Sequence, residues 1–191
     1  MQPAQPTASG IAGLSVDAAI VAGMYPLEPT RDGAPAQVRL LASGPAVREA
    51  QAAAAVLADA GIAAQVWSVT SWKQLRDDAL SSETWSRDHP DAPRLSHLQR
   101  SLGASGAPVV AVSDYVSALP DTLGRFVAAP FVSLGTDGYG VSGTREELRA
   151  HFGTDAAGIA AAATALVGAT DDRGLYAVPA PRSAHEPHLV A

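Results

Sequence analysis

Short apolar runs alternate with segments of helical periodicity along most of this chain, and that alternation limits the folds open to it. Each run has the length and composition of a buried strand. Because parallel strands need a long crossover between them, usually a helix, the alternation predicts a mostly parallel sheet covered by helices. We expect a three-layer α/β fold with five strands. The predicted strands cover residues 19–27, 37–42, 62–69, 108–113 and 130–134.

A short turn at residues 31–33 separates the first two predicted strands, and this hairpin-like start predicts one antiparallel strand at an edge of the sheet. Capping signals mark where two helices begin. Ser71 with Gln74, and Thr144 with Glu147, have the spacing of a capping box. Residues 80–93 are polar and predict an irregular connector. The helices are predicted at residues 45–60, from 72 onward, and at 94–102, 119–127, 144–151 and 155–167.

Composition excludes several classes of function. The 191 residues carry a formal net charge of −6, which disfavours nucleic acid and anionic membranes as partners. The chain has no cysteine, so disulfides and thiolate chemistry are absent. The uncharged, alanine-rich stretch 156–170 is shorter than the roughly 20 apolar residues of a membrane-spanning helix. We expect a cytoplasmic protein with a disordered leader at 1–15, a folded domain at 16–169 and a flexible, Pro-rich tail at 170–191.

Residues that follow the predicted strands should meet at one edge of the sheet, where ligands bind in open α/β folds. Asp114 and Asp137 therefore share that edge, either as a functional pair or, as we prefer, each capping a turn or helix through its own backbone. The glycines of segment 135–143 fit a tight turn better than an anion site, because the segment matches neither a P-loop nor a dinucleotide fingerprint.

Other potentially reactive residues show no catalytic or metal-binding spacing. The histidines form no HExxH motif and the serines no GxSxG motif. His151 lies at a predicted helix end, where it suits the helix dipole. The three tryptophans flank a strand and its following helix, which favours packing in the core or at a subunit contact over a ligand platform. They are Trp67, Trp72 and Trp85.

Four segments together resemble the last domain of homodimeric pyruvate dehydrogenase first components, a domain of the transketolase C-terminal type. The order and spacing of the segments agree with that family, and the likeness runs from about Asp17 to about Gly168. The segments are VWSVTSWKQL (66–75), ETWSRDHP (83–90), PVVAVSDYVSALPD (108–121) and LGTDGYGVSGTREELRAHFGTDA (134–156).

The resemblance implies a thiamine-diphosphate-dependent 2-oxoacid dehydrogenase in which this domain supports the dimer and the pyrimidine-binding domain. In such enzymes thiamine diphosphate and magnesium lie between a diphosphate-binding and a pyrimidine-binding domain. The family's GDG magnesium motif, its catalytic glutamate and its active-site histidines are absent from this chain. The resemblance therefore implies that the chain alone binds no cofactor, has no catalytic or metal residue, and needs partner chains carrying those two domains.

Contacts to the partner domain are predicted at Asp137, Tyr139, Ser142, Thr144 and Arg145, followed by Asp114 and Tyr115. The family commonly has DGFGRSDTR where this chain has DGYGVSGTR. Val141 and Gly143 thus replace a basic and an acidic residue, which implies a diverged enzyme.

Three interpretations follow. The chain is a separately encoded subunit in a homo- or hetero-oligomer whose partner chains decarboxylate a 2-oxoacid and transfer the acyl group, a fragment of a longer enzyme, or a free-standing binding or regulatory module.

Overall fold

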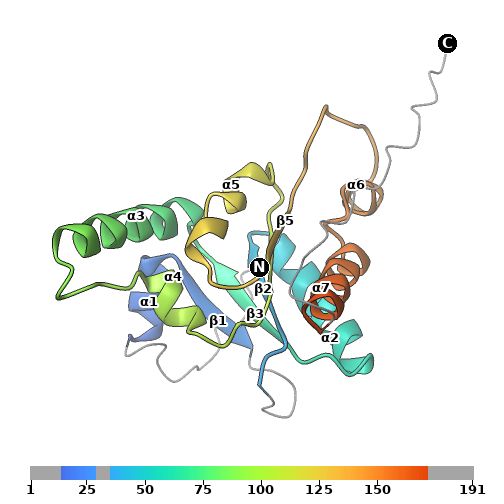
Figure 1. Ribbon diagram of the computed structural model, residues 1–191. Coiled ribbons are helices and arrows are strands. Elements are labelled where there is room, and N and C mark those ends of the chain that lie inside the picture. The colour runs from blue at the N-terminus through green and yellow to red at the C-terminus, as the bar shows by residue number, and fades with distance from the viewer. Residues whose placement is uncertain (1–13, 29–34, 172–191) are drawn as a thin grey trace.

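A computed structural model of the protein describes residues 14–28 and 35–171, without the side chains of Glu28, Thr170 and Asp171. Most of the predicted leader and tail, and the predicted turn at residues 31–33, lie outside these ranges. The described elements form a central sheet with helices on both faces (Figure 1). The strands are β1 (Met24–Glu28), β2 (Val38–Ser43), β3 (Ala64–Val69), β4 (Val109–Val112) and β5 (Phe131–Leu134).

The strand order is β1-β3-β2-β4-β5, and all pairs are parallel except β1 with β3. The predicted five-stranded sheet with one antiparallel edge strand is confirmed. The hairpin-like pairing of the first two strands is wrong, because Met24 of β1 is opposite Val69 of β3. Strand β2 lies between β3 and β4, so both of its hydrogen-bonding edges are already occupied.

The predicted strand at 19–27 is also wrong in its first half, which forms helix α1 (Val16–Ala22). The Ser15 hydroxyl accepts a hydrogen bond from the Ala18 nitrogen and caps the start. Gly23, with φ of 111°, ends the helix in a left-handed conformation and lets β1 begin at once. A short apolar run does not distinguish helix from strand, and here the two caps decide.

Different helices cover the two faces of the sheet (Figure 1). Helices α2 (Ala46–Asp59) and α7 (Ala156–Asp171) pack against each other and bury the first face. On the second face lie α3 (Trp72–Asp88), α4 (His97–Leu102) and the 3₁₀ turn η2 (Gly124–Phe126). Successive residues of β2 and β4 enter opposite clusters, as the two-residue period of a strand requires.

Helix α3 is longer than predicted, because the supposed connector at 80–93 is helical as far as Asp88. Leu75, Ala79 and Ser82 form its buried stripe. Because the buried position 82 is a polar serine, the apolar periodicity of a helix is not visible in this part of the sequence. The charged residues that follow Ser82 lie on the solvent side of the helix. Ser71 caps this helix as predicted, accepting a hydrogen bond from the Gln74 nitrogen at 3.1 Å.

Other predicted boundaries shift by a few residues. Helix α2 begins after Pro45 rather than after Gly44, and α4 begins at His97 because Ser96 and Gln99 form a capping box. The predicted helix 119–127 is the short α5 (Ala118–Asp121) followed by η2. Helix α7 passes through Gly168 instead of ending there.

One stretch of the described residues, Arg145–Ala169, is long and apolar enough to span a membrane by length and composition alone. It comprises two helices, α6 (Arg145–Phe152) and α7, separated by the left-handed Gly153. Buried residues of α7, including Ile159 and Leu166, belong to the core cluster that also contains α2. This stretch is therefore explained by packing within the domain.

Candidate functional site

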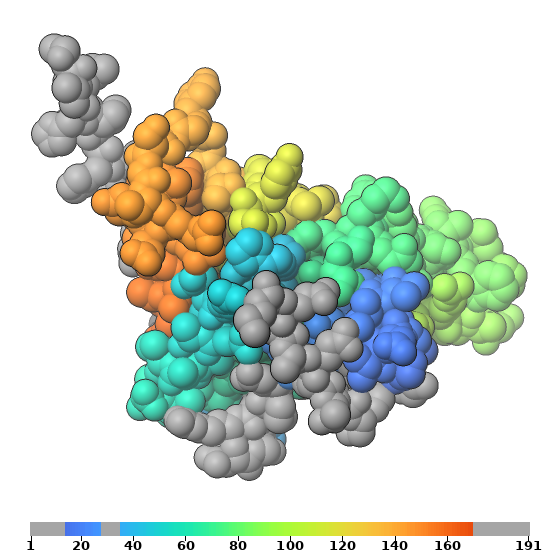
Figure 2. All heavy atoms as spheres, turned by 180° about the vertical axis from the view of Figure 1, so that it is seen from behind, coloured from blue at the N-terminus to red at the C-terminus, as the bar shows by residue number. Residues whose placement is uncertain are grey.

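The carboxyl ends of the four parallel strands meet at one edge of the sheet, as predicted from the order of the elements. The segment 135–144 leaves β5 at this edge, rises above the body of the domain and descends into α6 (Figure 1). From behind, the same segment projects as the top of a lobe that α6 completes (Figure 2). The predicted contact residues from Asp137 to Arg145 all lie in this lobe.

The base of the projecting segment is bonded to the loop that follows β4. The Thr136 nitrogen donates to the Tyr115 carbonyl at 2.8 Å, and the Thr136 hydroxyl donates to the Asp114 carbonyl at 3.2 Å. The Ser117 nitrogen donates to Oδ1 of Asp137 at 2.9 Å. Segments 114–117 and 135–137 therefore form one hydrogen-bonded unit beyond the ends of β4 and β5.

Asp114 and Asp137 share the edge but have different surroundings. Asp137 bonds the backbone of a loop 20 residues away, and so does not cap its own turn as we had preferred. The Asp114 carboxylate faces Gly44 at the start of α2, where a β-carbon would lie 3.6 Å from Oδ1. Nothing in the described contacts joins the two carboxylates into a proton-sharing pair.

Thr144 and Glu147 form the predicted capping box at the start of α6. The Glu147 carboxylate accepts from the Thr144 nitrogen at 2.8 Å, and the Glu147 nitrogen donates to the Thr144 hydroxyl at 3.3 Å. The hydrogen bond from the Thr144 backbone lowers the pKa of Glu147 most, and the hydrogen bond from the Thr144 hydroxyl lowers it further. Together they hold this pKa below the ordinary 4.5. The Thr144 side chain is thus committed to its own helix.

A cavity of about 560 Å³ lies between α6 and the start of α2. One wall is fixed by Arg149, whose guanidinium donates to Glu49 of α2 at 2.6 Å. The second carboxylate oxygen of Glu49 accepts from the Ala156 nitrogen at 3.2 Å, so one glutamate joins α2, α6 and α7. The cavity is lined by Pro45, Ala46, Asp114, Thr136, Gly143, Arg145, Leu148, Arg149, Phe152 and Thr154.

The donor set of this cavity does not fit a magnesium-bound diphosphate cofactor. Magnesium prefers an octahedron of oxygen ligands, and the cavity supplies a single carboxylate, Asp114. Across residues 14–28 and 35–171, no group of three or more His, Asp or Glu side chains is placed to hold a metal ion. No chemical step through thiamine diphosphate follows from these residues.

Exposed apolar side chains concentrate at the same edge of the sheet. Five of the nine large apolar side chains that are exposed in the described part of the chain lie in the loop after β4, in α5 or in the projecting segment 135–144. The extreme case is Tyr139, which is 97% exposed at the top of the projecting segment. The five are Tyr115, Val116, Leu119, Tyr139 and Val141. We call them the edge surface.

The structure thus brings Asp114 and Arg145 to one cavity, and Tyr115 and Tyr139 to one surface. Ser142 is exposed on the projecting segment. Sequence reasoning missed Glu49, Arg149 and Ser117, whose roles depend on contacts between distant segments. It also assigned no role to His97, which is buried and places Nε2 2.9 Å from the Met24 carbonyl oxygen.

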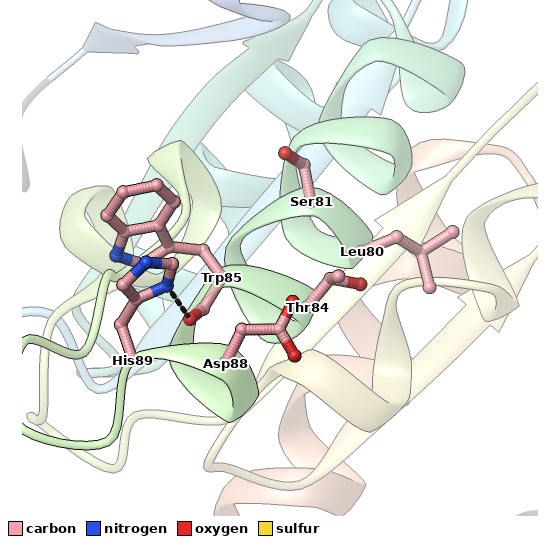
Figure 3. A pocket seen from close by; sticks show the side chains of 6 residues that line it. All are labelled: Leu80, Ser81, Thr84, Trp85, Asp88 and His89. Carbon is pink, nitrogen blue, oxygen red and sulfur yellow. Dashed lines mark hydrogen bonds between the residues drawn. The ribbon is translucent and has the colours of Figure 1, made fainter.

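A second hollow, of about 360 Å³, lies on α3 and is lined by Trp85, His89 and four neighbouring residues (Figure 3). The His89 ring stacks on the indole with centroids 3.9 Å apart, and the Trp85 N–H donates to the Ala92 carbonyl. Trp67 and Trp72 are buried in the core as predicted, whereas Trp85 is 44% exposed. The hollow follows the surface of a single helix and forms no enclosed site.

The described residues form a domain of the three-layer α/β class, with an apolar edge surface at the carboxyl ends of its parallel strands. A comparison with models of protein families identifies the family of this domain. The chain belongs to the family described as the transketolase-like TK C-terminal domain, which matches residues 23–155.

Curated relatives and solved structures agree with this assignment. The pyruvate dehydrogenase E1 component of Mycolicibacterium smegmatis is 39% identical over 163 residues, which are 84% of this chain and 17% of the relative. That of Escherichia coli is 39% identical over 144 residues, 74% of this chain and 16% of the relative. The chain thus spans about a sixth of these proteins.

Transketolase from Leishmania mexicana shares the fold with a TM-score of 0.57 and 23% identity, over 90% of this chain and 21% of that one. A transketolase structure from Pichia stipitis gives a TM-score of 0.58 and 21% identity, over 88% of this chain and 21% of that one. These likenesses confirm the expected fold.

Proposed function

We propose that this chain is the C-terminal domain, or a separately encoded subunit, of a thiamine-diphosphate-dependent enzyme of the pyruvate dehydrogenase E1 type. Partner polypeptide supplies the active site, decarboxylates a 2-oxoacid and transfers the acyl group. One observation carries the proposal: 39% identity to a pyruvate dehydrogenase E1 component that extends over 84% of this chain but only 17% of the relative.

The chemistry of the domain supports an accessory role. Decarboxylation on thiamine diphosphate requires a held cofactor, and the cavity beside α6 offers one carboxylate and two guanidinium groups instead of a magnesium shell. The edge surface supports contact with further polypeptide, because large apolar side chains gathered on one side of a domain mark interaction sites. The domain therefore serves as a rigid support that presents an apolar edge to the catalytic domains.

Reconstitution tests the proposal. The chain is co-expressed with the products of neighbouring genes that encode thiamine-diphosphate motifs, and the complex is purified through a tag on this chain. We expect a stoichiometric complex that decarboxylates a 2-oxoacid in the presence of thiamine diphosphate and magnesium, with no turnover when either component is omitted. Turnover by this chain alone, or full activity of the partner chains without it, would overturn the proposal.

A free-standing binding module is the alternative, and the cavity between α2 and α6 favours it. Arg145 at its rim has no hydrogen-bond or ion-pair partner among the described contacts, and Asp114 places a carboxylate in the same cavity. Under this alternative the purified chain is a stable monomer and binds a small charged ligand by itself. Sedimentation velocity and a thermal-shift screen of charged metabolites distinguish the two functions.

A further inference from the structure

We infer that Asp137 is a positioning residue that holds the edge surface in one conformation for docking the catalytic domains. The inference rests on the proposed function and assigns Asp137 a different role from direct contact with a partner. The edge surface comes from two segments that are distant in sequence, 115–119 and 139–141. A surface made of two loops binds more tightly when the loops are fixed relative to each other before binding, because less conformational entropy is then lost.

The carboxylate of Asp137 makes that connection. Its Oδ1 accepts from the Ser117 nitrogen at 2.9 Å, at the centre of the first segment. Asp137 itself lies two residues before Tyr139, the most exposed apolar side chain of the surface. The bond therefore joins the loop carrying Tyr115 and Val116 to the root of the loop carrying Tyr139 and Val141.

Other hydrogen bonds join the two loops nearer the sheet, but they do not replace the bond between Asp137 and Ser117. The bonds of Thr136 to the carbonyls of Asp114 and Tyr115 lie closer to the strands. Beyond Asp137, the described contacts include no hydrogen bond from segment 138–143 to the β4–α5 loop, and every residue of the segment is exposed. Asp137 is thus the last anchor before the projecting segment leaves the domain.

The occupant of the edge surface is an apolar face of the catalytic polypeptide that makes up the rest of the relatives' length. The relatives are about six times longer than the matched segment, which is 17% of their length. The surface presents the hydroxyl groups of two tyrosines beside apolar side chains, which is the composition of a protein interface core. The partner face should accordingly be apolar with hydrogen-bonding groups.

Three variants of the full chain test the inference in the reconstituted complex. Asp137→Ala removes the acceptor, Asp137→Asn keeps an oxygen acceptor but removes the charge, and Asp121→Ala removes an exposed carboxylate from neighbouring α5. Affinity for the partner chains is measured by biolayer interferometry. Protection of the Ser117 amide is measured by hydrogen exchange in the isolated chain. Thermal unfolding establishes that all variants fold.

We expect Asp137→Ala to weaken binding about tenfold, the effect of roughly 1.4 kcal/mol, and to release the Ser117 amide. Asp137→Asn and Asp121→Ala should bind within about twofold of the wild type, with Ser117 still protected in both. Equal losses for Asp137→Ala and Asp137→Asn would show that the charge contacts the partner directly and overturn the positioning role. Wild-type affinity in Asp137→Ala would overturn this inference alone, whereas absence of binding by the wild-type chain would overturn the proposed function with it.

Discussion

The backbones of Gly135 and Ser117 are in direct contact: a β-carbon on residue 135 would lie 2.4 Å from the Ser117 nitrogen. The same β-carbon would lie 2.5 Å from the Tyr115 carbonyl oxygen. Real side chains do not approach backbone atoms this closely, so only glycine permits the two loops to meet. This contact brings the Asp137 carboxylate within hydrogen-bonding distance of Ser117.

Gly135→Ala should therefore destabilise the domain by about 1 to 3 kcal/mol, because the added methyl forces the two loops apart. Gly140→Ala is the matched control, since a β-carbon there meets nothing within 4 Å. Urea unfolding monitored by tryptophan fluorescence gives the free energy of unfolding of each variant. Equal stability of the two variants would contradict the close contact of the loops.

Glu49→Ala should cost about 1.5 to 3 kcal/mol of stability, because it removes a charge-assisted hydrogen bond to Arg149 and the acceptor of the Ala156 nitrogen. Both side chains of the ion pair are about one-fifth exposed, so solvent screens the pair only partly. Asp77→Ala provides the comparison. It breaks the more exposed pair with Lys73 and should change the free energy of unfolding by less than about 1 kcal/mol. Chemical denaturation of both variants measures the difference in the free energy of unfolding. A larger loss of stability in Asp77→Ala than in Glu49→Ala would contradict the role of Glu49 in joining α2, α6 and α7.

His97 is predicted to be a structural residue with its proton on Nε2, because the Met24 carbonyl beside that nitrogen can only accept. His97→Leu leaves this buried carbonyl without its side-chain donor and should lower stability by about 1 to 3 kcal/mol. The exposed His151 is the control, and His151→Ala should cost less than about 1 kcal/mol. Nitrogen chemical shifts of the imidazole report the tautomer, and a proton on Nδ1 in the folded state would contradict this assignment.

The capping box of α6 should respond to acid. The folded-state pKa of Glu147 lies below the ordinary 4.5, so its contribution is fully present above the unfolded value. That contribution is lost as the pH falls through the folded pKa. We expect protection of the first-turn amides of α6, measured by hydrogen exchange and corrected for intrinsic rates, to fall across this acidic range.

The matched variants for this prediction are Glu147→Gln and Glu146→Gln, which remove adjacent exposed carboxylates from the same turn. Glu147→Gln should make the protection insensitive to pH, whereas Glu146→Gln should keep the wild-type profile. An unchanged pH profile in Glu147→Gln would show that Glu147 does not cap the helix through its charge.

The four parallel strands and the starts of α3 and α6 were predictable because their signals are local. Buried β3 and β4 are runs of apolar residues, and the hydroxyl caps of α3 and α6 act within three residues of sequence. The far end of α3 was not predictable, since its buried stripe ends in Ser82 and its last turn is polar. The boundary between α1 and β1 is set by the caps at Ser15 and Gly23. It was not predictable, because residues 19–27 form one continuous apolar run that suits a strand as well as a helix.

The sequence by itself determined the layered α/β architecture, the carboxyl edge as the place where candidate residues gather, and the resemblance to one domain family. Only the tertiary structure decided which partner each residue has at that edge. Asp137 bonds Ser117 across 20 positions, and Arg149 bonds Glu49 across 100. The physical reason is that local propensities act over a few residues, whereas such bonds form only after the sheet brings distant segments within about 3 Å.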